Sequence, residues 1–149
     1  VFGLKTADKI VVQTQFQKIL LRSAFNREGI LIKNVYPYPV QPVIEKKHPV
    51  VLWVSTIRSW KQPELFLDLA RSLPHIAFRM VGGPAKDTPG TSAANDHYYR
   101  NIRKEAESIP NLEFSGFIPY SAIDQVFSDA AIFVNTSTHE GFPNTFLQA

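Results

Sequence analysis

Apolar runs alternate with amphipathic stretches along most of this chain. Each short apolar run, which predicts a strand, is followed by a segment whose apolar positions recur at helical spacing. The expected strand and helix pairs are 50–55 with 63–73, 76–82 with 95–108, 112–115 with 120–128, and 131–136 with a helix from 143 onward. Strands that alternate with helices pair in parallel through crossover connections. The pattern therefore predicts an α/β fold with a parallel sheet and flanking helices.

The first third of the chain forms a separate part of this pattern. Residues 9–14 predict a strand, 15–27 a helix and 30–36 a second strand, after which prolines and a polar run predict a linker at 37–49. We expect the main domain at 50–149. Because the chain begins without methionine and stops inside a predicted helix, we expect an internal fragment whose second domain is truncated at its C-terminus.

The amino-acid composition excludes several classes of protein and of functional site. The chain has 149 residues, of which 44% are hydrophobic and 19% charged, and this balance is typical of a globular protein. It has no cysteine, which excludes disulfides, thiolate nucleophiles and cysteine-ligated metals and is compatible with a reducing compartment. The sequence has no apolar run of about 20 residues and no signal peptide pattern, so neither a membrane span nor secretion is expected.

Positive charge is concentrated in the first third. Residues 1–49 carry a net charge of +5 and residues 50–149 a net charge of −2. In the basic part, Phe16, Ile19 and Leu20 recur at helical spacing beside Lys and Arg side chains. Such a helix either packs its apolar stripe on a core, which we favour, or lies on an anionic membrane surface. No basic stripe with interleaved aromatics occurs, so no nucleic acid partner is expected.

The segment Ser137–Gln148 carries the strongest candidate chemistry. It places a carboxylate, Glu140, and a glycine on the turn between a buried strand and a helix, with Pro143 at the first helical position. Unpaired amides at such a helix start attract anions. The amides expected to face a ligand are those of Gly141, Phe142, Asn144 and Thr145. Asn144 and Gln148, four residues apart, share one helix face. This layout predicts a nucleotide-sugar site.

Four stretches in register resemble one enzyme family. The pattern E-G-F-P-N-x-x-L-Q at 140–148 resembles the E-G-F-G/P…E signature of retaining glycosyltransferases of family 4, which have the two-domain GT-B fold. Upstream, 51–67, 80–83 and 109–117 resemble, in the same order, the opening strand with its phosphate-binding Lys, the glycine loop and the segment that frames the nucleobase. The resemblance implies a Rossmann-like nucleotide-sugar-binding domain at 50–149 and the end of the acceptor-side domain at 1–36.

The resemblance also implies roles for single residues. Glu140 would lie against the hydroxyls of the donor sugar, although the turn alone is also compatible with a helix-dipole partner. Lys61 would meet the diphosphate, and Arg58 would substitute for an Arg that the family has at the position of Thr56. Gln148 stands where the family has a ribose-binding Glu; a neutral amide still bonds a diol, and a solvent-facing Gln is the alternative. The other implied donor-binding residues are Gly82, Phe117 and Ile118.

The activity implied by the resemblance is transfer of a sugar, with retention, from a nucleoside-diphosphate sugar to a hydroxyl on a sugar, lipid-linked or glycan acceptor. We expect a cytoplasmic enzyme of glycan or polysaccharide biosynthesis, at the inner face of the membrane if the basic helix binds lipid, and an isolated fragment without activity. The four histidines lack metal-ligand spacing, so no metal and no other cofactor are expected. The alternatives are a binding-only nucleotide-sugar module and a GT-B sugar-nucleotide epimerase.

Overall fold

The computed structural model describes residues 2–36, 49–85 and 92–149. These residues divide into two compact units, and each is described by itself. Unit 1 comprises Val1–Val40 with Glu140–Gln148, and unit 2 comprises Gln41–His139 with Ala149. The predicted linker at 37–49 lies outside the described residues except for its last position.

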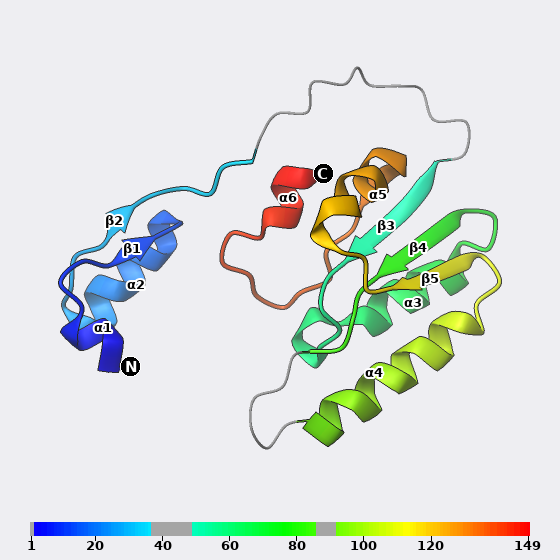
Figure 1. Ribbon diagram of the computed structural model, residues 1–149, viewed down its shortest axis with the longest axis horizontal. Coiled ribbons are helices and arrows are strands. Elements are labelled where there is room, and N and C mark those ends of the chain that lie inside the picture. The colour runs from blue at the N-terminus through cyan, green and yellow to red at the C-terminus, as the bar shows by residue number, and fades with distance from the viewer. Residues whose placement is uncertain (1, 37–48, 86–91) are drawn as a thin grey trace. The chain divides into compact units, whose positions relative to one another are not determined.

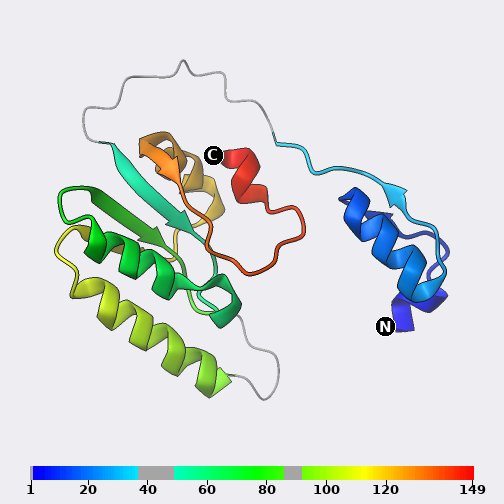
Figure 2. The same cartoon turned by 180° about the vertical axis from the view of Figure 1, so that it is seen from behind.

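Unit 2 is built around a parallel sheet of four strands in the order β5-β4-β3-β6 (Figures 1 and 2). Each strand pairs in parallel with its neighbours. The strands are β3 (Val50–Val54), β4 (Ala77–Val81), β5 (Leu112–Gly116) and β6 (Ala130–Phe133). The prediction of an α/β fold with a Rossmann-like parallel sheet is confirmed.

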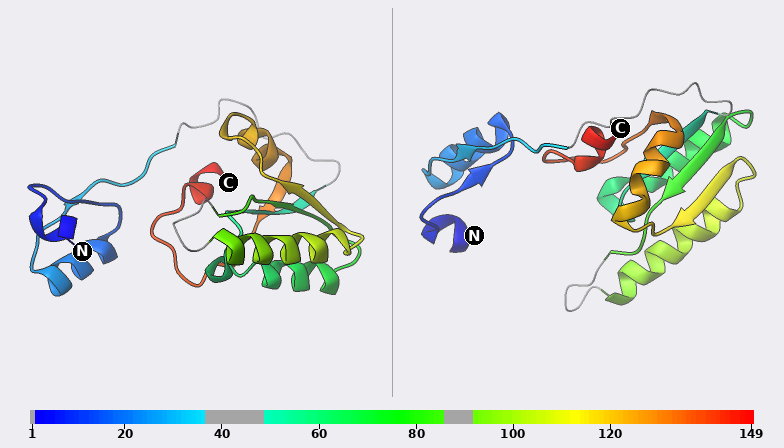
Figure 3. Two further views of the ribbon diagram at one scale, coloured as in Figure 1. Left: turned by 60° about the horizontal axis from the view of Figure 1, so that its bottom comes forward. Right: turned by 45° about the horizontal axis from the view of Figure 1, so that its top comes forward.

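Helices cover both faces of this sheet. Figure 3 shows α3 and α4 on one face and α5 on the other. The helices of unit 2 are α3 (Pro63–Ser72), α4 (Ser92–Glu107) and α5 (Ile123–Asp129), with two short 3-10 helices, η1 (Ser59–Lys61) and η2 (Tyr120–Ala122). The predicted helices all form, with ends shifted by a few residues, whereas η1 was not predicted.

Two buried clusters lie on the two faces of β3, because successive side chains of a strand point to opposite sides. Val51 and Trp53 belong to the larger cluster, which also holds residues of α3 and α4. Leu52 belongs to the smaller cluster with three residues of α5. The larger cluster is rich in aromatic contacts: the ring centroid of Phe66 lies 6.4 Å from that of Trp53 and 5.4 Å from that of Phe78. The strand β3 is therefore buried on both faces, as strands of parallel sheets usually are.

Unit 1 is small and has few buried residues. Its elements are α1 (Phe2–Thr6), β1 (Val11–Val12), α2 (Gln15–Phe25), β2 (Ile30–Leu31) and α6 (Asn144–Gln148), with β1 and β2 paired in parallel. A capping box starts α2: the Thr14 side chain accepts from the Gln17 backbone amide, and the Gln17 side chain accepts from the Thr14 amide. The core of the unit consists of Ile10, Val12 and Leu21.

The expectation that the apolar stripe of α2 packs on a core is wrong for the described chain. Phe16, Ile19 and Leu20 are exposed, and Leu21 is the residue of α2 that is buried. The two short strands bury only the face of the helix that carries Leu21. None of the helices in the described ranges is long and apolar enough to cross a membrane.

Candidate functional site

The loops after all four strands of unit 2 leave the sheet at its carboxyl edge, where ligands bind in open parallel sheets. Backbone hydrogen bonds join these loops to one another and to the ends of the neighbouring strands. The Ser55 amide donates to the Val81 carbonyl (3.1 Å), the Ile57 amide to the Gly83 carbonyl (3.0 Å), and the Gly82 amide to the Gly116 carbonyl (2.9 Å). The predicted site residues of unit 2 lie on or directly beside this bonded edge.

Gly82 has a structural reason to be glycine. A Cβ atom at this position would lie 2.3 Å from the Ser55 carbonyl oxygen and 3.1 Å from Cγ1 of Ile57. Real Cβ atoms do not approach a backbone oxygen so closely, so any side chain would push the loop after β3 away from β4. Gly82 therefore allows close approach of two strand ends, which is one of the general uses of glycine.

Lys61 lies on η1, the 3-10 helix in the loop after β3. The Lys61 amide donates to the Arg58 carbonyl, and the Gln62 amide donates to the Ser59 carbonyl, both at 3.0 Å. Gln62 takes a left-handed conformation with φ of 46°, and α3 then begins with Pro63 at its start. The predicted helix start at Pro63 is confirmed, and the turn that carries Lys61 is closed by its own backbone bonds.

Trp60 connects the two cations of this turn to the loop after β6. The Arg58 guanidinium carbon lies 4.9 Å from the centroid of the Trp60 ring, within range of a cation–π contact. The Trp60 ring also stacks on the imidazole of His139, with centroids 6.2 Å apart. The Thr138 amide donates to the Trp60 carbonyl at 3.0 Å. Trp60 was not among the predicted site residues, although its position between Arg58 and Lys61 was an available signal.

Phe117 and Ile118 follow β5 at the same edge. The Phe117 side chain is 74% exposed, while Ile118 is partly buried and packs against the cluster that contains Leu52 and α5. A Cβ atom at Gly83 would lie 3.1 Å from Cβ of Phe117, so the loops after β4 and β5 touch there. Phe117 is thus available to a ligand, whereas Ile118 belongs largely to the core.

The remaining predicted site residues lie in unit 1. Glu140, Gly141 and Phe142 precede α6, which begins at Asn144, so Pro143 stands one position before the helix rather than at its first turn. The Phe146 amide donates to the Pro143 carbonyl at 3.2 Å. Assigned helix ends commonly differ by a residue, so the predicted start is close to the observed one. Thr145, within α6, is partly exposed.

Side-chain amides of unit 1 hold the segment before α6. The amide nitrogen of Asn34 donates to the Phe142 carbonyl (3.0 Å) and to Oδ1 of Asn144 (2.9 Å). Oδ1 of Asn34 accepts from Nε2 of Gln13 at 2.5 Å. At the other end of α6, Nε2 of Gln148 lies 3.5 Å from the Tyr36 hydroxyl. Asn34 was not among the predicted site residues, since its link to 142–144 depends on contacts between distant parts of the sequence.

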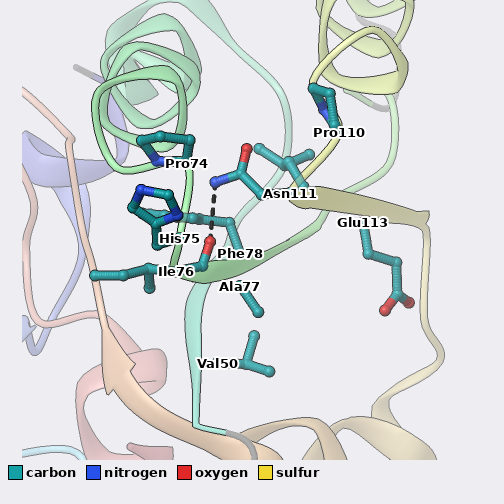
Figure 4. Close-up of a pocket in the computed structure, with 10 residues that line it drawn as sticks. Val50, Pro74, His75, Ile76, Ala77, Phe78, Pro110, Asn111 and Glu113 are labelled. Carbon is teal, nitrogen blue, oxygen red and sulfur yellow. Dashed lines mark hydrogen bonds between the residues drawn. The ribbon is translucent and has the colours of Figure 1, made fainter.

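A hollow of about 460 Å³ lies at the opposite, amino-terminal edge of the unit 2 sheet (Figure 4). Three polar side chains line it, those of His75, Asn111 and Glu113. The side-chain amide of Asn111 donates to three carbonyls at or after the end of α3, those of Ala70, Leu73 and Ile76, at 2.9–3.0 Å, and so closes the end of that helix. It does not contain any predicted site residue.

Within residues 2–36, 49–85 and 92–149, no group of three or more His, Asp and Glu side chains is placed to hold a metal ion. The expectation that no metal is needed stays a prediction.

Comparison with protein-family models identifies one family. The family model described as "Glycosyl transferases group 1" matches residues 37–149. A search of curated proteins finds no match to the chain.

Solved structures share the fold. Anabaena Alr3699/HepE, solved in complex with UDP and glucose, is 20% identical with a TM-score of 0.75 over 99% of this chain and 43% of that one. A mutant of S. aureus TarM, solved with Fondaparinux, alpha-GlcNAc-glycerol and UDP, is 16% identical with a TM-score of 0.74 over 99% of this chain and 29% of that one. The chain thus spans less than half the length of either protein.

Proposed function

Because the chain belongs to the glycosyl transferases group 1 family, we propose that the protein transfers a sugar from a nucleoside-diphosphate sugar to a hydroxyl acceptor. We further propose that it is a retaining enzyme of family 4, acting on a sugar, lipid-linked or glycan acceptor in glycan or polysaccharide biosynthesis. UDP is present in the HepE and TarM structures that share its fold, which supports a nucleoside diphosphate as the ligand of the donor site.

The observation that carries this proposal is the position of Lys61. Its turn follows β3 at the carboxyl edge of the sheet and is closed by backbone bonds. The leaving group of the proposed reaction is a diphosphate whose negative charge grows in the transition state. A cation held at a fixed place stabilises such charge without having to reorganise, which is the largest contribution in many enzymes. We assign this role to Lys61 and a supporting one to Arg58.

The donor would be framed by further residues of the same edge. We propose that Gly82 lets the backbone approach the nucleotide and that Phe117 and Ile118 flank the base. From the resemblance of 140–148 to the family signature, we also propose that Glu140 contacts the hydroxyls of the donor sugar, that the segment from Gly141 through Thr145 supplies amides to the distal phosphate, and that Gln148 bonds the ribose.

We also propose that the enzyme works in the cytoplasm and without a metal ion. We propose further that residues outside this chain form the acceptor side of the site, so that the isolated chain binds nucleotide without transferring sugar. Turnover by the isolated chain would contradict this assignment of the acceptor side.

The test uses the full-length protein that contains this chain. A ligand-observed binding screen of UDP-, GDP- and ADP-sugars identifies the donor, and transfer to acceptors is then assayed with Lys61→Gln beside Lys104→Gln. Lys104 is an exposed cation in the last turn of α4 and serves as the matched control. We expect Lys61→Gln to lower kcat by about 10²-fold to 10³-fold, as the loss of one pre-organised group typically does, and Lys104→Gln to leave it unchanged.

The outcomes separate the proposed function from its alternatives. Binding of a nucleotide sugar without transfer would favour a binding-only module, and conversion of the donor to an epimer would favour an epimerase. Absence of any nucleotide binding would refute the proposal. Equal activity of Lys61→Gln and Lys104→Gln would leave the proposed reaction standing and would show that Lys61 takes no part in it.

A further inference from the structure

The hydroxyl of Thr136 connects the core of unit 2 to the turn that carries Lys61. The indole nitrogen of Trp53 donates to Oγ1 of Thr136 at 2.9 Å, and the Thr136 hydroxyl donates to the Lys61 carbonyl at 2.6 Å. The Thr136 hydroxyl thus accepts a hydrogen bond from a side chain of β3 and donates one to a backbone carbonyl of η1. A hydroxyl has one proton to donate, and here it is directed at Lys61.

The end of this connection that lies at Trp53 is rigid. Trp53 is 2% exposed, lies on the central strand β3 and packs its ring against Phe66. Side chains in such a core occupy single rotamers at high packing density. The indole N–H therefore presents a fixed donor to Thr136, and the strand β6 that precedes Thr136 is itself bonded to β3, with the Val134 amide donating to the Leu52 carbonyl at 2.8 Å.

The other end of the connection is η1, which has few stabilising bonds of its own. η1 is a three-residue 3-10 helix with no side-chain bond at either its own N-cap or that of α3, and it ends at Gln62 in a left-handed conformation. Short 3-10 segments have poorer hydrogen-bond geometry than α-helices, so they depend on external contacts. The carbonyl of Lys61 receives such a contact from Thr136, and the carbonyl of Trp60 receives another from the amide of Thr138 at 3.0 Å.

We propose that Thr136 is a positioning residue for Lys61: by fixing the Lys61 carbonyl against the sheet, it sets where the Lys61 side chain meets the diphosphate of the donor. This inference rests on the proposed function, in which Lys61 binds that diphosphate. The Thr136 hydroxyl itself bonds protein groups on both sides and acts on the ligand only through Lys61.

The test measures binding of UDP and of uridine to the full-length protein and to two variants. Thr136→Val keeps the shape of the side chain and removes the hydroxyl, whereas Thr136→Ser keeps the hydroxyl. GDP with guanosine or ADP with adenosine replaces this pair if the donor screen identifies another base. Ligand-observed NMR follows the weak nucleoside, and calorimetry follows the diphosphate.

We expect Thr136→Val to weaken UDP binding by about tenfold or more, since a misplacement of about 1 Å caused far from the chemistry can cost about 10²-fold. Uridine binding should stay within about twofold, because the nucleoside lacks the diphosphate that Lys61 contacts. Thr136→Ser should restore UDP affinity to within about threefold of the wild type. A merely structural role would weaken both ligands together or neither.

A second variant separates positioning from loss of stability. Phe78→Leu destabilises the same core, since Phe78 is buried against Phe66, yet it leaves the Thr136 hydroxyl in place. It should lower Tm at least as much as Thr136→Val while UDP affinity stays near that of the wild type. If Thr136→Val does not fold, a Thr136→Ser variant with wild-type Tm and UDP affinity supports the inference, and one with tenfold weaker UDP binding overturns it.

The result that would overturn the inference alone is UDP binding by Thr136→Val equal to that of the wild type, or an equal loss in Phe78→Leu. A wild-type protein that binds none of the three nucleoside diphosphates would instead refute the proposed function, and this inference with it.

Discussion

Substitution of Gly82 by alanine should destabilise unit 2 because the added methyl group has no room. A Cβ atom there would lie 2.3 Å from the Ser55 carbonyl oxygen, whereas ordinary contacts begin at 3.4 Å. About 1 Å of backbone movement is therefore needed. The backbone on either side of the clash cannot move freely. The Ser55 amide is bonded to the Val81 carbonyl and the Ile57 amide to the Gly83 carbonyl, the two residues that flank Gly82.

The magnitude follows from these contacts. Overpacking typically costs about 1–3 kcal/mol, and weakening one of the two backbone bonds adds about 0.5–1.5 kcal/mol. We expect Gly82→Ala to lower the free energy of unfolding of unit 2 by about 2–4 kcal/mol. For a unit of this size that corresponds to a fall in Tm of roughly 10 °C or more.

Gly83→Ala is the matched control. The nearest atoms to a Cβ at Gly83 belong to the side chain of Phe117, at 3.1 Å and beyond. The atom at 3.1 Å is the Cβ of Phe117, so a shift of a few tenths of an ångström relieves the contact, and we expect a cost below about 1 kcal/mol. The two neighbouring glycines thus differ in how far the backbone has to move.

Urea denaturation followed by tryptophan fluorescence measures both variants. The chain has two tryptophans, Trp53 and Trp60, and both belong to unit 2, so the signal reports that unit. Surface substitutions ordinarily change the free energy of unfolding by about 0.5 kcal/mol or less. A Gly82→Ala variant whose free energy of unfolding lies within about 0.5 kcal/mol of the wild type would therefore refute the reasoning. So would a Gly83→Ala variant that costs as much as Gly82→Ala.

Three further substitutions test other parts of the structure. Asn111→Ala removes an amide that donates to three backbone carbonyls at or after the end of α3, and we expect a loss of about 2–3 kcal/mol in urea denaturation; a loss below 0.5 kcal/mol would contradict the capping role. Burial and its hydrogen bond to Glu64 raise the pKa of Tyr98, so the folded state keeps this proton while the unfolded chain loses it above about pH 10. Wild-type stability should therefore fall more steeply from about pH 9 to about pH 11 than that of Tyr98→Phe, and parallel profiles would contradict the shift. Glu140→Gln in the full-length enzyme should lower kcat by about 10²-fold to 10³-fold with little change in Tm, and unchanged turnover would leave Glu140 a turn residue only.

The sheet and its helices could be predicted because their signal is local. The run Val50–Val54 is apolar throughout, as a strand buried on both faces must be, and Pro63 marks the start of the next helix. Both features lie within a few residues of one another in the sequence. The helix α2 was also predicted from local spacing, but the expected burial of its apolar stripe was wrong. Spacing shows which residues share a face of a helix, and it does not show what covers that face.

The contacts that hold the carboxyl edge could not be predicted in the same way. Thr136 and Lys61 are 75 residues apart, and the pair formed by Trp53 and Thr136 spans 83 residues. The reason for Gly82 is likewise the carbonyl of Ser55 on a different strand. Such constraints appear only once β3 lies between β4 and β6, so the sequence supplied candidate residues and the fold supplied their partners.

The loop between β3 and α3 is fixed at both of its ends, by different strands. At its start, the Ser55 amide is bonded to Val81 at the end of β4 and the Ile57 amide to Gly83 just after it; at its end, the carbonyls of Trp60 and Lys61 are bonded to the loop after β6. The backbone of a loop held in this way has little freedom left to lose when an anion binds beside it. Arg58 is held differently, by contact with the Trp60 ring, which is itself 39% exposed. The backbone that carries Lys61 is therefore held from two sides, whereas Arg58 is positioned through its guanidinium; in the proposed function both cations would meet the diphosphate of the donor.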